Sequence, residues 1–542
     1  MSEYCVKGNL VDVHNRKIFP ARIEISDNII KRIVEIEGEL DNYILPGFID
    51  SHLHIESSML TPSGFAKIAV GHGTIGAVCD PHEIANVLGV KGINYMVESS
   101  STVPFKCFFG APSCVPATKF DSSGATLDSE AIRLLLKRSD IYFLAEMMNY
   151  PGVINNDVDV IKKIKHAIDL DKPIDGHAPG LRGLGLKKYV DAGISTDHEC
   201  ISIEEAEEKI NVGMKIQIRE GSAARGFDKF FSLIDKFPGS VMLCSDDKHP
   251  QDLIRGHINE LLRRGIEKEV DFFNILRAAT VNPVFHYNLP VGLLREGDYA
   301  DFIVINDLKS FLVKETYING LKVFSNGRTL FDKSGVELNC DFRTNLISKV
   351  DLLVPAREKN IKVIRVIDGE LFTKAETAKA NIINGFIESE IEKDICKIVV
   401  TNKYSDKLPF TGFIRGFGLQ KGAIAGSVAH DSHNIIAVGA DDTSICEAIN
   451  TIIEMKGGLV VVCDDETEKL RLEIGGLMTN EDAGLVANNY ERLEDYAKKL
   501  GSKLKSPFMS LSFMSLLVIP ELKISDTGLF DVNKFGFTSL YA

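Results

Sequence analysis

The stretch PGFIDSHLHIESSM, residues 46–59, begins with a short apolar run and continues into two histidines one residue apart, His52 and His54. In a β-strand, residues i and i+2 point to the same side, so the two imidazoles would face one point in space. Imidazole is the commonest protein ligand for transition metals. The stretch therefore indicates the beginning of a metal site at the end of a buried strand.

Seven more short apolar segments of strand character follow, separated by stretches long enough for a helix. In chain order the eight segments, between about residues 46 and 247, are PGFID, TIGAVCD, FKCFFGAPS, IYFLAEMMN, PIDGHAP, GISTDHE, MKIQIREGS and VMLCSDD. Strands that alternate with helices are parallel, and near-continuous apolar runs indicate strands buried on both faces. We therefore predict an α/β fold built on a TIM-like (β/α)8 barrel.

The sequence on either side of the barrel has a different texture. Residues 1–46 alternate short β-type runs with turn residues, and similar β-rich sequence returns at 292–340. Two such segments can pair into one small β-sandwich domain. We expect this domain at 1–46 with 292–340, the barrel at 47–291, and a C-terminal α/β or α+β domain at 341–542.

Charge and cysteine usage exclude several classes of protein. The formal net charge of −14 argues against nucleic acid as a partner, since nucleic-acid binders carry a basic face, and favours a small-molecule substrate. Ten scattered cysteines without a Cys-x-x-Cys pair fit free thiols in a reducing compartment. The N-terminus lacks a signal pattern and no apolar run is long enough for a membrane span, so we expect a cytoplasmic protein without a membrane partner.

Polar side chains gather at the C-terminal ends of the predicted strands, where the active sites of (β/α)8 barrels lie. A lone buried histidine is more often a hydrogen-bonded core residue than a ligand, but several candidates at one rim favour a metal centre. Imidazole and carboxylate ligands without thiolate suit manganese, iron or zinc. The candidate ligands are His52, His54, Glu146, His177, His198 and Asp246.

This pattern resembles the amidohydrolase superfamily, whose barrels carry His-x-His on strand one, an anionic bridging group on strand four, histidines on strands five and six, and an aspartate on strand eight. Many members use a carboxylated lysine as the bridge, whereas this sequence has Glu146. A carboxylate between two cations offsets their repulsion. The segments CDPHEIANVLG (79–89), GHAPG, REGSAARG and GSVAHDSHNI (426–435) extend the resemblance to the adenine deaminases, over the whole chain.

The resemblance implies hydrolytic deamination of adenine to hypoxanthine and ammonia in purine salvage. It also implies a binuclear divalent metal centre held by the six candidate ligands, with Mn²⁺ or Fe²⁺ expected first and Zn²⁺ as the alternative. Barrels of this kind often self-associate, so we expect a homo-oligomer, a dimer first. The sequence leaves two other functions open: a cyclic-amide hydrolase of the hydantoinase or dihydroorotase type, and a non-catalytic metal-binding barrel.

Deamination needs groups that move protons. Asp246 is the candidate acceptor of the proton of the attacking hydroxide, its alternative role being that of a ligand or helix N-cap only. Attack at C6 pushes electron density onto N1, which an acid must protonate. Glu83 follows the second strand and Glu220 the seventh, so either could face the substrate. We favour Glu83 as the acid, and a structural salt bridge or loop hydrogen bond is the competing role.

Two further features are candidates for substrate contact. Arg219 could orient the purine edge or neutralise the neighbouring Glu220. The segment HDSHN, with His430, Asp431 and His433, is implied by the resemblance to form a family-specific loop near the active site, and a polar turn after a glycine-rich strand explains its composition equally well.

Overall fold

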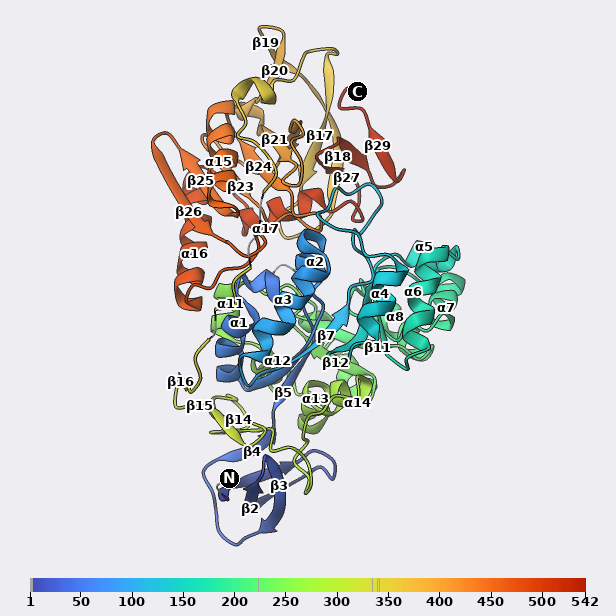
Figure 1. Ribbon diagram of the computed structural model, residues 1–542, viewed down its shortest axis with the longest axis vertical. Helices are drawn as coiled ribbons and strands as arrows, with labels where there is room; N and C mark the ends of the chain where they lie inside the picture. Colours follow the sequence, from blue (N-terminus) through green and yellow to red (C-terminus); the bar gives the residue numbers. More distant parts are fainter. Residues whose placement is uncertain (1–2, 223, 334, 339, 341) are drawn as a thin grey trace. The chain divides into compact units, whose positions relative to one another are not determined.

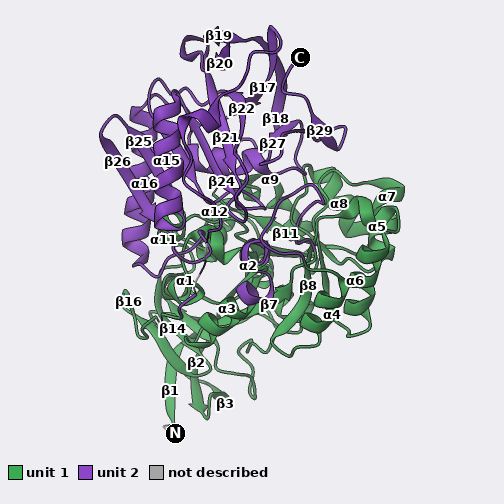
Figure 2. Cartoon of the chain, turned by 45° about the horizontal axis from the view of Figure 1, so that its top comes forward, with its two compact units in different colours: residues 1–81, 94–113, 127–336 green, residues 82–93, 114–126, 337–542 purple. Residues whose placement is uncertain are grey.

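The computed structural model describes residues 3–222, 224–333, 335–338, 340 and 342–542. The chain forms two compact units (Figure 2), which we call the barrel unit (residues 1–81, 94–113 and 127–336) and the C-terminal unit (residues 82–93, 114–126 and 337–542). The segments 82–93 and 114–126 lie in the stretch of sequence expected to form the barrel, but their contacts group them with the C-terminal residues. Among the helices of the described residues, none has the length and apolar character needed to cross a membrane.

Eight parallel strands form the core of the barrel unit, one in each of the segments singled out in the sequence. Every residue of the first, second and eighth of these strands is buried, as expected for strands covered on both faces. The strands are β5 (Phe48–Leu53), β6 (Thr74–Cys79), β7 (Lys106–Ala111), β8 (Ile141–Met147), β9 (Ile174–Gly176), β10 (Thr196–Asp197), β11 (Lys215–Arg219) and β12 (Val241–Cys244).

Hydrogen bonds close these strands into a ring. The strands β5 to β9 form one sheet in chain order and β10 to β12 form another. The N–H of Ser195 donates to the carbonyl oxygen of Ile174 (2.9 Å), which joins the two sheets on one side. On the other side the N–H of Asp246 donates to the carbonyl oxygen of His52 (3.0 Å). The predicted (β/α)8 barrel is confirmed, and its closure brings the end of the last strand beside the end of the first.

Helices follow the barrel strands, as the alternation in the sequence predicts (Figure 1). Several begin at a side-chain cap: Thr61 accepts from the N–H of Gly64, and Asp271 from the N–H of Asn274. The helices are α1 (Pro62–Ala69), α3 (Val90–Ser101), α4 (Ser129–Leu136), α5 (Tyr150–Ile154), α6 (Val158–Ile168), α7 (Gly183–Asp191), α8 (Ile203–Asn211), α9 (Phe227–Phe230), α10 (Ser232–Lys236), α11 (Pro250–Arg255), α12 (Ile258–Glu267), α13 (Phe272–Ala279) and α14 (Val281–His286), with 3-10 turns η1 (Ile55–Ser58) and η2 (Val70–His72).

The two β-rich segments that flank the barrel in sequence pair with each other. Antiparallel pairing of Tyr43 with Ile305 and of Ile44 with Val304 joins them into one continuous sheet. This eight-stranded sheet corresponds to the small β domain expected from the two flanking segments. Its apolar core includes Ile23, Phe302 and Tyr317. Its strands, in spatial order, are β16 (Arg328–Thr329), β15 (Leu321–Ser325), β14 (Val313–Ile318), β13 (Phe302–Ile305), β4 (Tyr43–Pro46), β1 (Tyr4–Asp12), β2 (Lys17–Ser26) and β3 (Ile29–Glu35).

The C-terminal unit is built on a second eight-stranded sheet. Its central strands carry valine, isoleucine and alanine and are fully buried, as in β24 and β25. In spatial order the strands are β18 (Thr373–Lys379), β17 (Asn360–Val366), β22 (Phe410–Arg415), β21 (Ile395–Thr401), β24 (Ile435–Gly439), β23 (Ala423–Gly426), β25 (Gly458–Cys463) and β26 (Glu466–Arg471). Smaller sheets pair β19 (Asn381–Ile383) with β20 (Phe386–Glu388), and β27 (Leu522–Ile524) with β28 (Leu529–Asp531) and β29 (Gly536–Thr538).

Helices of the C-terminal unit pack on this sheet. The helix α15 (Asp442–Met455) contacts β23, β24 and β25, and its residues Ile445, Ala448 and Ile449 join the apolar core. The unit also contains α2 (His82–Leu88), α16 (Ala483–Lys499), α17 (Pro507–Ser512) and the 3-10 turns η3 (Lys349–Leu352), η4 (Ile391–Lys393) and η5 (Phe513–Ser515). Mixed strands and helices match the predicted α/β or α+β character of this part of the chain.

Candidate functional site

The six candidate metal ligands stand at the carboxyl ends of five barrel strands. His52 lies in β5, and His54 directly follows that strand. Glu146 is the last residue but one of β8, His177 and His198 directly follow β9 and β10, and Asp246 is the second residue after β12. Parallel strands present these ends at one rim of the barrel. The positions of these residues at strand ends in the sequence therefore correctly placed all six side chains at the same rim.

Their ligating atoms converge in space. The Nε2 atoms of His52 and His54 lie 3.2 Å apart, and they lie 3.5 and 3.3 Å from Oδ1 of Asp246. Oε1 of Glu146 lies 3.4 Å from His54 Nε2, and Oε2 of the same carboxylate lies 2.6 Å from His177 Nδ1 and 3.4 Å from His198 Nε2. Glu146 therefore turns one oxygen towards the His-x-His pair and the other towards the histidines of β9 and β10.

Both carboxylates of the cluster are ionised. Burial opposes the charge on Glu146, but the charge of His177 and its hydrogen bond outweigh burial and hold the pKa of Glu146 well below its usual range. Burial likewise opposes the charge on Asp246, and hydrogen bonds from His52 and His54, with the charge of Arg219, hold the pKa of Asp246 well below its usual range. Two buried negative groups among imidazoles form a site whose charge a bound cation would balance.

Ring orientation supports the same conclusion. Nδ1 of His54 lies 3.1 Å from the carbonyl oxygen of Asp80, and because a carbonyl only accepts, Nδ1 carries the hydrogen. Nε2 of His54 therefore faces the cluster, and in the neutral ring its lone pair would be available to a metal, which is how metal-ligating histidines are held. Ligands about 2.1 Å from one ion lie roughly 3 Å from each other, and the separations of His52, His54 and Asp246 match that spacing. The six residues fit a divalent metal centre.

Arg219, a predicted substrate-binding residue, contacts two carboxylates of the barrel rim. Its Nη1 lies 2.8 Å from Oδ2 of Asp246, and it also donates to Oε1 of Glu199. Nη2 lies 2.8 Å from Oε2 of Glu199. Glu199 was not singled out in the sequence, although it directly follows His198 in the segment GISTDHE. Glu199 would have been found in the sequence if the residue after each strand-end candidate had also been considered.

Glu220, the other predicted substrate-binding residue of this segment, is held by protein groups. Its Oε1 pairs with Nη1 of Arg264, and its Oε2 accepts from the N–H of Phe227 (3.0 Å). Arg219 does not neutralise it, because Arg219 pairs with Glu199 and Asp246. These contacts support a structural role for Glu220, and substrate binding by this residue stays a prediction.

Glu83 lies in α2 of the C-terminal unit, where two histidines of the HDSHN segment bind it. His430 Nδ1 lies 2.6 Å from Oε1 of Glu83, and His433 Nε2 contacts Oε2. Burial opposes the charge on Glu83, but its interactions with the two imidazoles, first of all with His430, hold the pKa of Glu83 well below the usual range. Asp431, the third candidate of the segment, is also buried. The segment thus forms a binding loop for a carboxylate, which its composition alone did not reveal.

The ring of His433 has a defined hydrogen position. Its Nδ1 lies 3.2 Å from the backbone nitrogen of Ala429, whose N–H must be the donor. His433 Nδ1 is therefore an acceptor, and the hydrogen on Nε2 points to Glu83. Burial lowers the pKa of His433 to about 4, so the ring is neutral at neutral pH. A lone pair for a metal is missing on the side that faces Glu83.

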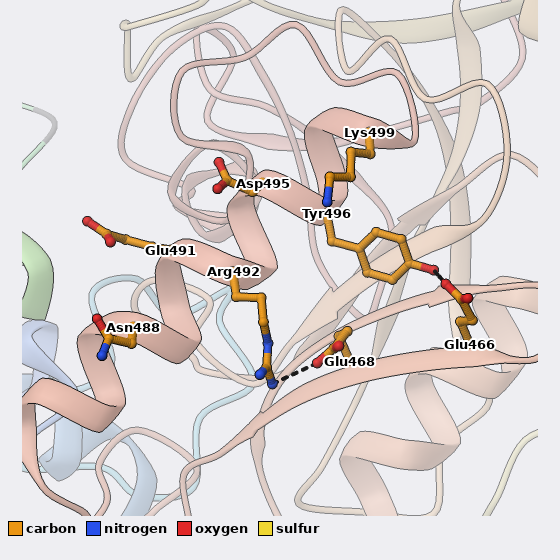
Figure 3. A pocket seen from close by; sticks show the side chains of 8 residues that line it. All are labelled: Glu466, Glu468, Asn488, Glu491, Arg492, Asp495, Tyr496 and Lys499. Atoms are coloured by element: carbon orange, nitrogen blue, oxygen red, sulfur yellow. Dashed lines mark hydrogen bonds and ion pairs between the residues drawn. The ribbon is translucent and has the colours of Figure 1, made fainter.

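The C-terminal unit has a groove on its surface, distant in sequence from the carboxylate held by His430 and His433 (Figure 3). It lies between β26 and α16 and is lined largely by charged residues. Two of its carboxylates pair with neighbours: Glu468 binds Nη2 of Arg492 at 2.8 Å, and Glu466 accepts from the hydroxyl of Tyr496 at 2.7 Å. The groove contains none of the candidate site residues.

Comparisons with known proteins agree with this arrangement. The model of the amidohydrolase family matches residues 43–323, and that of the adenine deaminase C-terminal domain matches residues 370–536. A protein named adenine deaminase from Methanosarcina acetivorans is 53% identical over 546 residues, with 99% of each chain covered. One of the same name from Salinibacter ruber is 48% identical over 542 residues, covering 100% of this chain and 99% of that one.

Among solved structures, a beta-aspartyl dipeptidase from Fervidobacterium islandicum AW-1 is 14% identical, with a TM-score of 0.47 over 62% of this chain and all of that one. The relatives and the two family models carry the assignment, because they agree along nearly the entire sequence. The chain belongs to the adenine deaminase family of the amidohydrolase superfamily.

Proposed function

We propose that this chain catalyses the hydrolytic deamination of adenine, in which adenine and water give hypoxanthine and ammonia. The observation that carries the proposal is the convergence of all six candidate ligands at one barrel rim, in a chain whose full-length relatives are named adenine deaminase. A place in purine salvage follows from this reaction.

The six ligands would hold two divalent ions. Glu146 is the proposed bridge, because its two oxygens face different histidines: Oε1 faces His54, and Oε2 faces His177 and His198. When bound, the ions supply Lewis acidity that makes water a competent nucleophile at neutral pH. Mn²⁺ or Fe²⁺ is the expected metal, with Zn²⁺ as the alternative, since imidazole and carboxylate ligands accept all three.

Asp246 is the proposed proton acceptor. It is buried and ionised, and Oδ1 faces the imidazoles of His52 and His54. A carboxylate at this place can take a proton from the attacking water and return it to the departing amino group, which leaves as ammonia. Loss of the C6–N bond then balances formation of the C6–O bond.

Glu83 is the proposed proton donor to the ring nitrogen N1. It comes four residues after the end of β6 in sequence. Because its carboxylate is ionised in the free protein, it must first gain a proton, and the imidazoles of His430 and His433 are the groups in contact with its oxygens. His430, Asp431 and His433 are proposed as supporting residues of this acid, and the substrate-binding roles of Arg219 and Glu220 stay predictions.

Turnover of adenine by metal-reconstituted protein tests the proposal. We expect the ultraviolet spectrum to shift from adenine to hypoxanthine, with one ammonia released per adenine consumed. Hydantoin and dihydroorotate serve as substrates for the cyclic-amide alternative. Turnover of either of these without turnover of adenine would overturn the proposal, and inactivity on all three with full metal loading would favour a non-catalytic barrel. A homodimer and a cytoplasmic location stay predictions.

A further inference from the structure

Arg219 occupies a central place at the rim of the barrel. It is the last residue of β11, and β11 is the middle strand of the sheet β10–β11–β12. Glu199 is the second residue after β10, and Asp246 is the second residue after β12. The guanidinium of Arg219 therefore reaches a carboxylate from the neighbouring strand on each side.

The two oxygens of Asp246 have separate partners. Oδ1 faces the Nε2 atoms of His52 and His54 at 3.5 and 3.3 Å, whereas Oδ2 lies 2.8 Å from Nη1 of Arg219. The backbone of Asp246 is in the left-handed region, with φ of 54°, and its N–H and carbonyl bond to the first strand segment. A rotation about χ2 of Asp246 would break the contact of Oδ2 with Arg219, so this contact decides where Oδ1 points.

Glu199 in turn orients Arg219. The two carboxylate oxygens of Glu199 take Nη1 and Nη2 of Arg219 separately, which is the planar two-point pairing that an arginine makes with a carboxylate. The side chains of Glu199 and Arg219 are 13% and 16% exposed. Because both Nη atoms already donate to carboxylates, the guanidinium is engaged by protein groups and is poorly placed to be a principal contact for a purine edge.

We infer that Arg219 and Glu199 are positioning residues, which fix Oδ2 of Asp246 and so aim Oδ1 at the imidazoles of the His-x-His pair. The expected effect on kcat rests on the proposed function, whereas the expected effect on metal affinity does not. Arg219 acts through Asp246: a misdirected carboxylate would bind metal less tightly and accept a proton less well. A lysine would not replace it, because an ammonium lacks the planar fork that spans two carboxylates.

The test compares Arg219→Met, Arg219→Lys and Glu199→Gln with the full-length wild-type protein, each by two measurements. Metal affinity is measured with Mn²⁺ against a competing chelator, without adenine. We expect the affinity of Arg219→Met to fall by about 10- to 100-fold, the usual loss when a group behind a ligand is removed. We expect its kcat for adenine to fall by about 100-fold with KM changed by less than about threefold, because misplacement of a reacting group acts on the chemical step.

Rescue separates positioning from a general structural role. Added guanidinium ion should restore part of the kcat of Arg219→Met, since it can enter between Glu199 and Asp246. Glu199→Gln keeps the size of the side chain and removes the charge, and we expect a smaller loss in the same direction. Circular dichroism shows whether Arg219→Met folds. If it does not fold, Glu199→Gln provides the test.

The matched control is Arg138→Met. Arg138 makes the same two-point pair with Asp140, by Nε to Oδ1 at 2.8 Å and by Nη2 to Oδ2 at 2.7 Å, at the opposite end of β8. Its metal affinity and kcat should equal those of the wild type. A rise in KM with unchanged kcat and unchanged metal affinity in Arg219→Met would overturn the inference and make Arg219 a substrate contact. If the wild type fails to deaminate adenine, the proposed function fails, while the order of metal affinities still decides the inference.

Discussion

The barrel unit and the C-terminal unit each bury histidines around carboxylate oxygens. In the barrel, Nδ1 of His54 donates to the carbonyl oxygen of Asp80, so Nε2 faces the cluster and in the neutral ring would offer its lone pair to a metal. In the C-terminal unit, Nδ1 of His433 accepts from the N–H of Ala429, so Nε2 carries a hydrogen that points to Glu83. In both rings the backbone group bonded to Nδ1 thus determines whether Nε2 suits a metal or a carboxylate.

The two clusters also differ in how their carboxylates are shared. Glu146 faces four imidazoles: its contact with His177 is a hydrogen bond of 2.6 Å, whereas its contacts with His52, His54 and His198 are at 3.4 to 4.0 Å, which leaves room for an ion between ligands. Glu83 has one histidine on each oxygen at hydrogen-bonding distance. Similar residue types therefore build a candidate metal site in the barrel unit and a hydrogen-bonded carboxylate in the C-terminal unit.

The largest effect is expected for Asp246→Asn. Removing the charge would deprive the barrel cluster of a proposed metal ligand and of the proposed proton acceptor, so kcat for adenine should fall by about 10³- to 10⁴-fold. Steady-state assay of metal-loaded protein measures the loss, and circular dichroism checks that the fold is retained. Activity close to that of the wild type would refute the role of Asp246.

Glu83→Gln should have the next largest effect. The amide keeps the size of the side chain but is not a proton donor of the right acidity, so kcat should fall by about 100-fold with little change in KM. Steady-state kinetics with adenine separate the two constants. An increase in KM alone would assign Glu83 to substrate binding, and unchanged kinetics would leave it with a structural hydrogen bond.

Metal content should respond to the barrel cluster and not to the other. His198→Asn should lower the metal content below that of the wild type, since it removes one of the ligands that face Glu146. His433→Gln should leave metal content unchanged, because His433 has no lone pair towards Glu83. Elemental analysis of protein purified without added metal measures both. A loss of metal in His433→Gln would break the contrast between the clusters.

The acid limb of stability should depend on His433. Its folded-state pKa of about 4 lies below the usual 6.5, so its neutral form contributes stability that is present above pH 6.5 and lost as pH falls towards 4. Over that window the loss is at most about 3 kcal/mol. His433→Gln lacks this group, so its thermal midpoint should fall less steeply between pH 6.5 and 4 than that of the wild type.

That comparison needs a second variant, because Glu83, His430 and Lys403 also act on His433. Glu83 has a depressed pKa, and its own contribution is present above its unfolded value near 4.5 and is lost as pH falls below it. In Glu83→Gln the slope between pH 6.5 and 4.5 should therefore persist. An identical slope in the wild type and in His433→Gln would contradict the neutral ring.

The smallest effect is expected for Glu220→Gln. Its carboxylate pairs with Arg264, whose side chain is 22% exposed, so the variant should lose about 1 kcal/mol of stability. The KM for adenine should change by less than about threefold, which corresponds to less than 1 kcal/mol of binding energy. The reason is that both oxygens of Glu220 are already held by Arg264 and the N–H of Phe227. Chemical denaturation and adenine kinetics measure the two quantities. A tenfold rise in KM would restore Glu220 as a substrate contact.

Much of the barrel could be predicted from the sequence. Eight apolar segments with polar ends identified all eight strands. Parallel strands in a barrel are buried on both faces, and their active-site residues lie at the carboxyl ends. The same rule placed His177 and His198 at the rim, directly after β9 and β10, although they are 21 residues apart in the chain. Local pattern was sufficient wherever a strand end carried the ligand.

Other features depended on contacts that no local pattern contains. Glu199 is one residue beyond the strand-end histidine, and only its pairing with Arg219 distinguishes it from a loop acid. The segments 82–93 and 114–126 read as barrel sequence yet group with the C-terminal unit. Glu83 meets His430 across 347 residues of chain. Such pairings follow from packing of distant segments, which periodicity and residue type do not encode.

By itself the sequence determined the barrel, the residue types of its candidate metal site and the family, because strand burial and ligand chemistry are set by the order of apolar and polar residues. Only the tertiary structure decided which nitrogen of each ring faces a ligand and which carboxylate each cation holds. Those choices depend on single backbone groups and neighbouring strands, such as Ala429 behind His433 and β10 beside Arg219, that folding brings together.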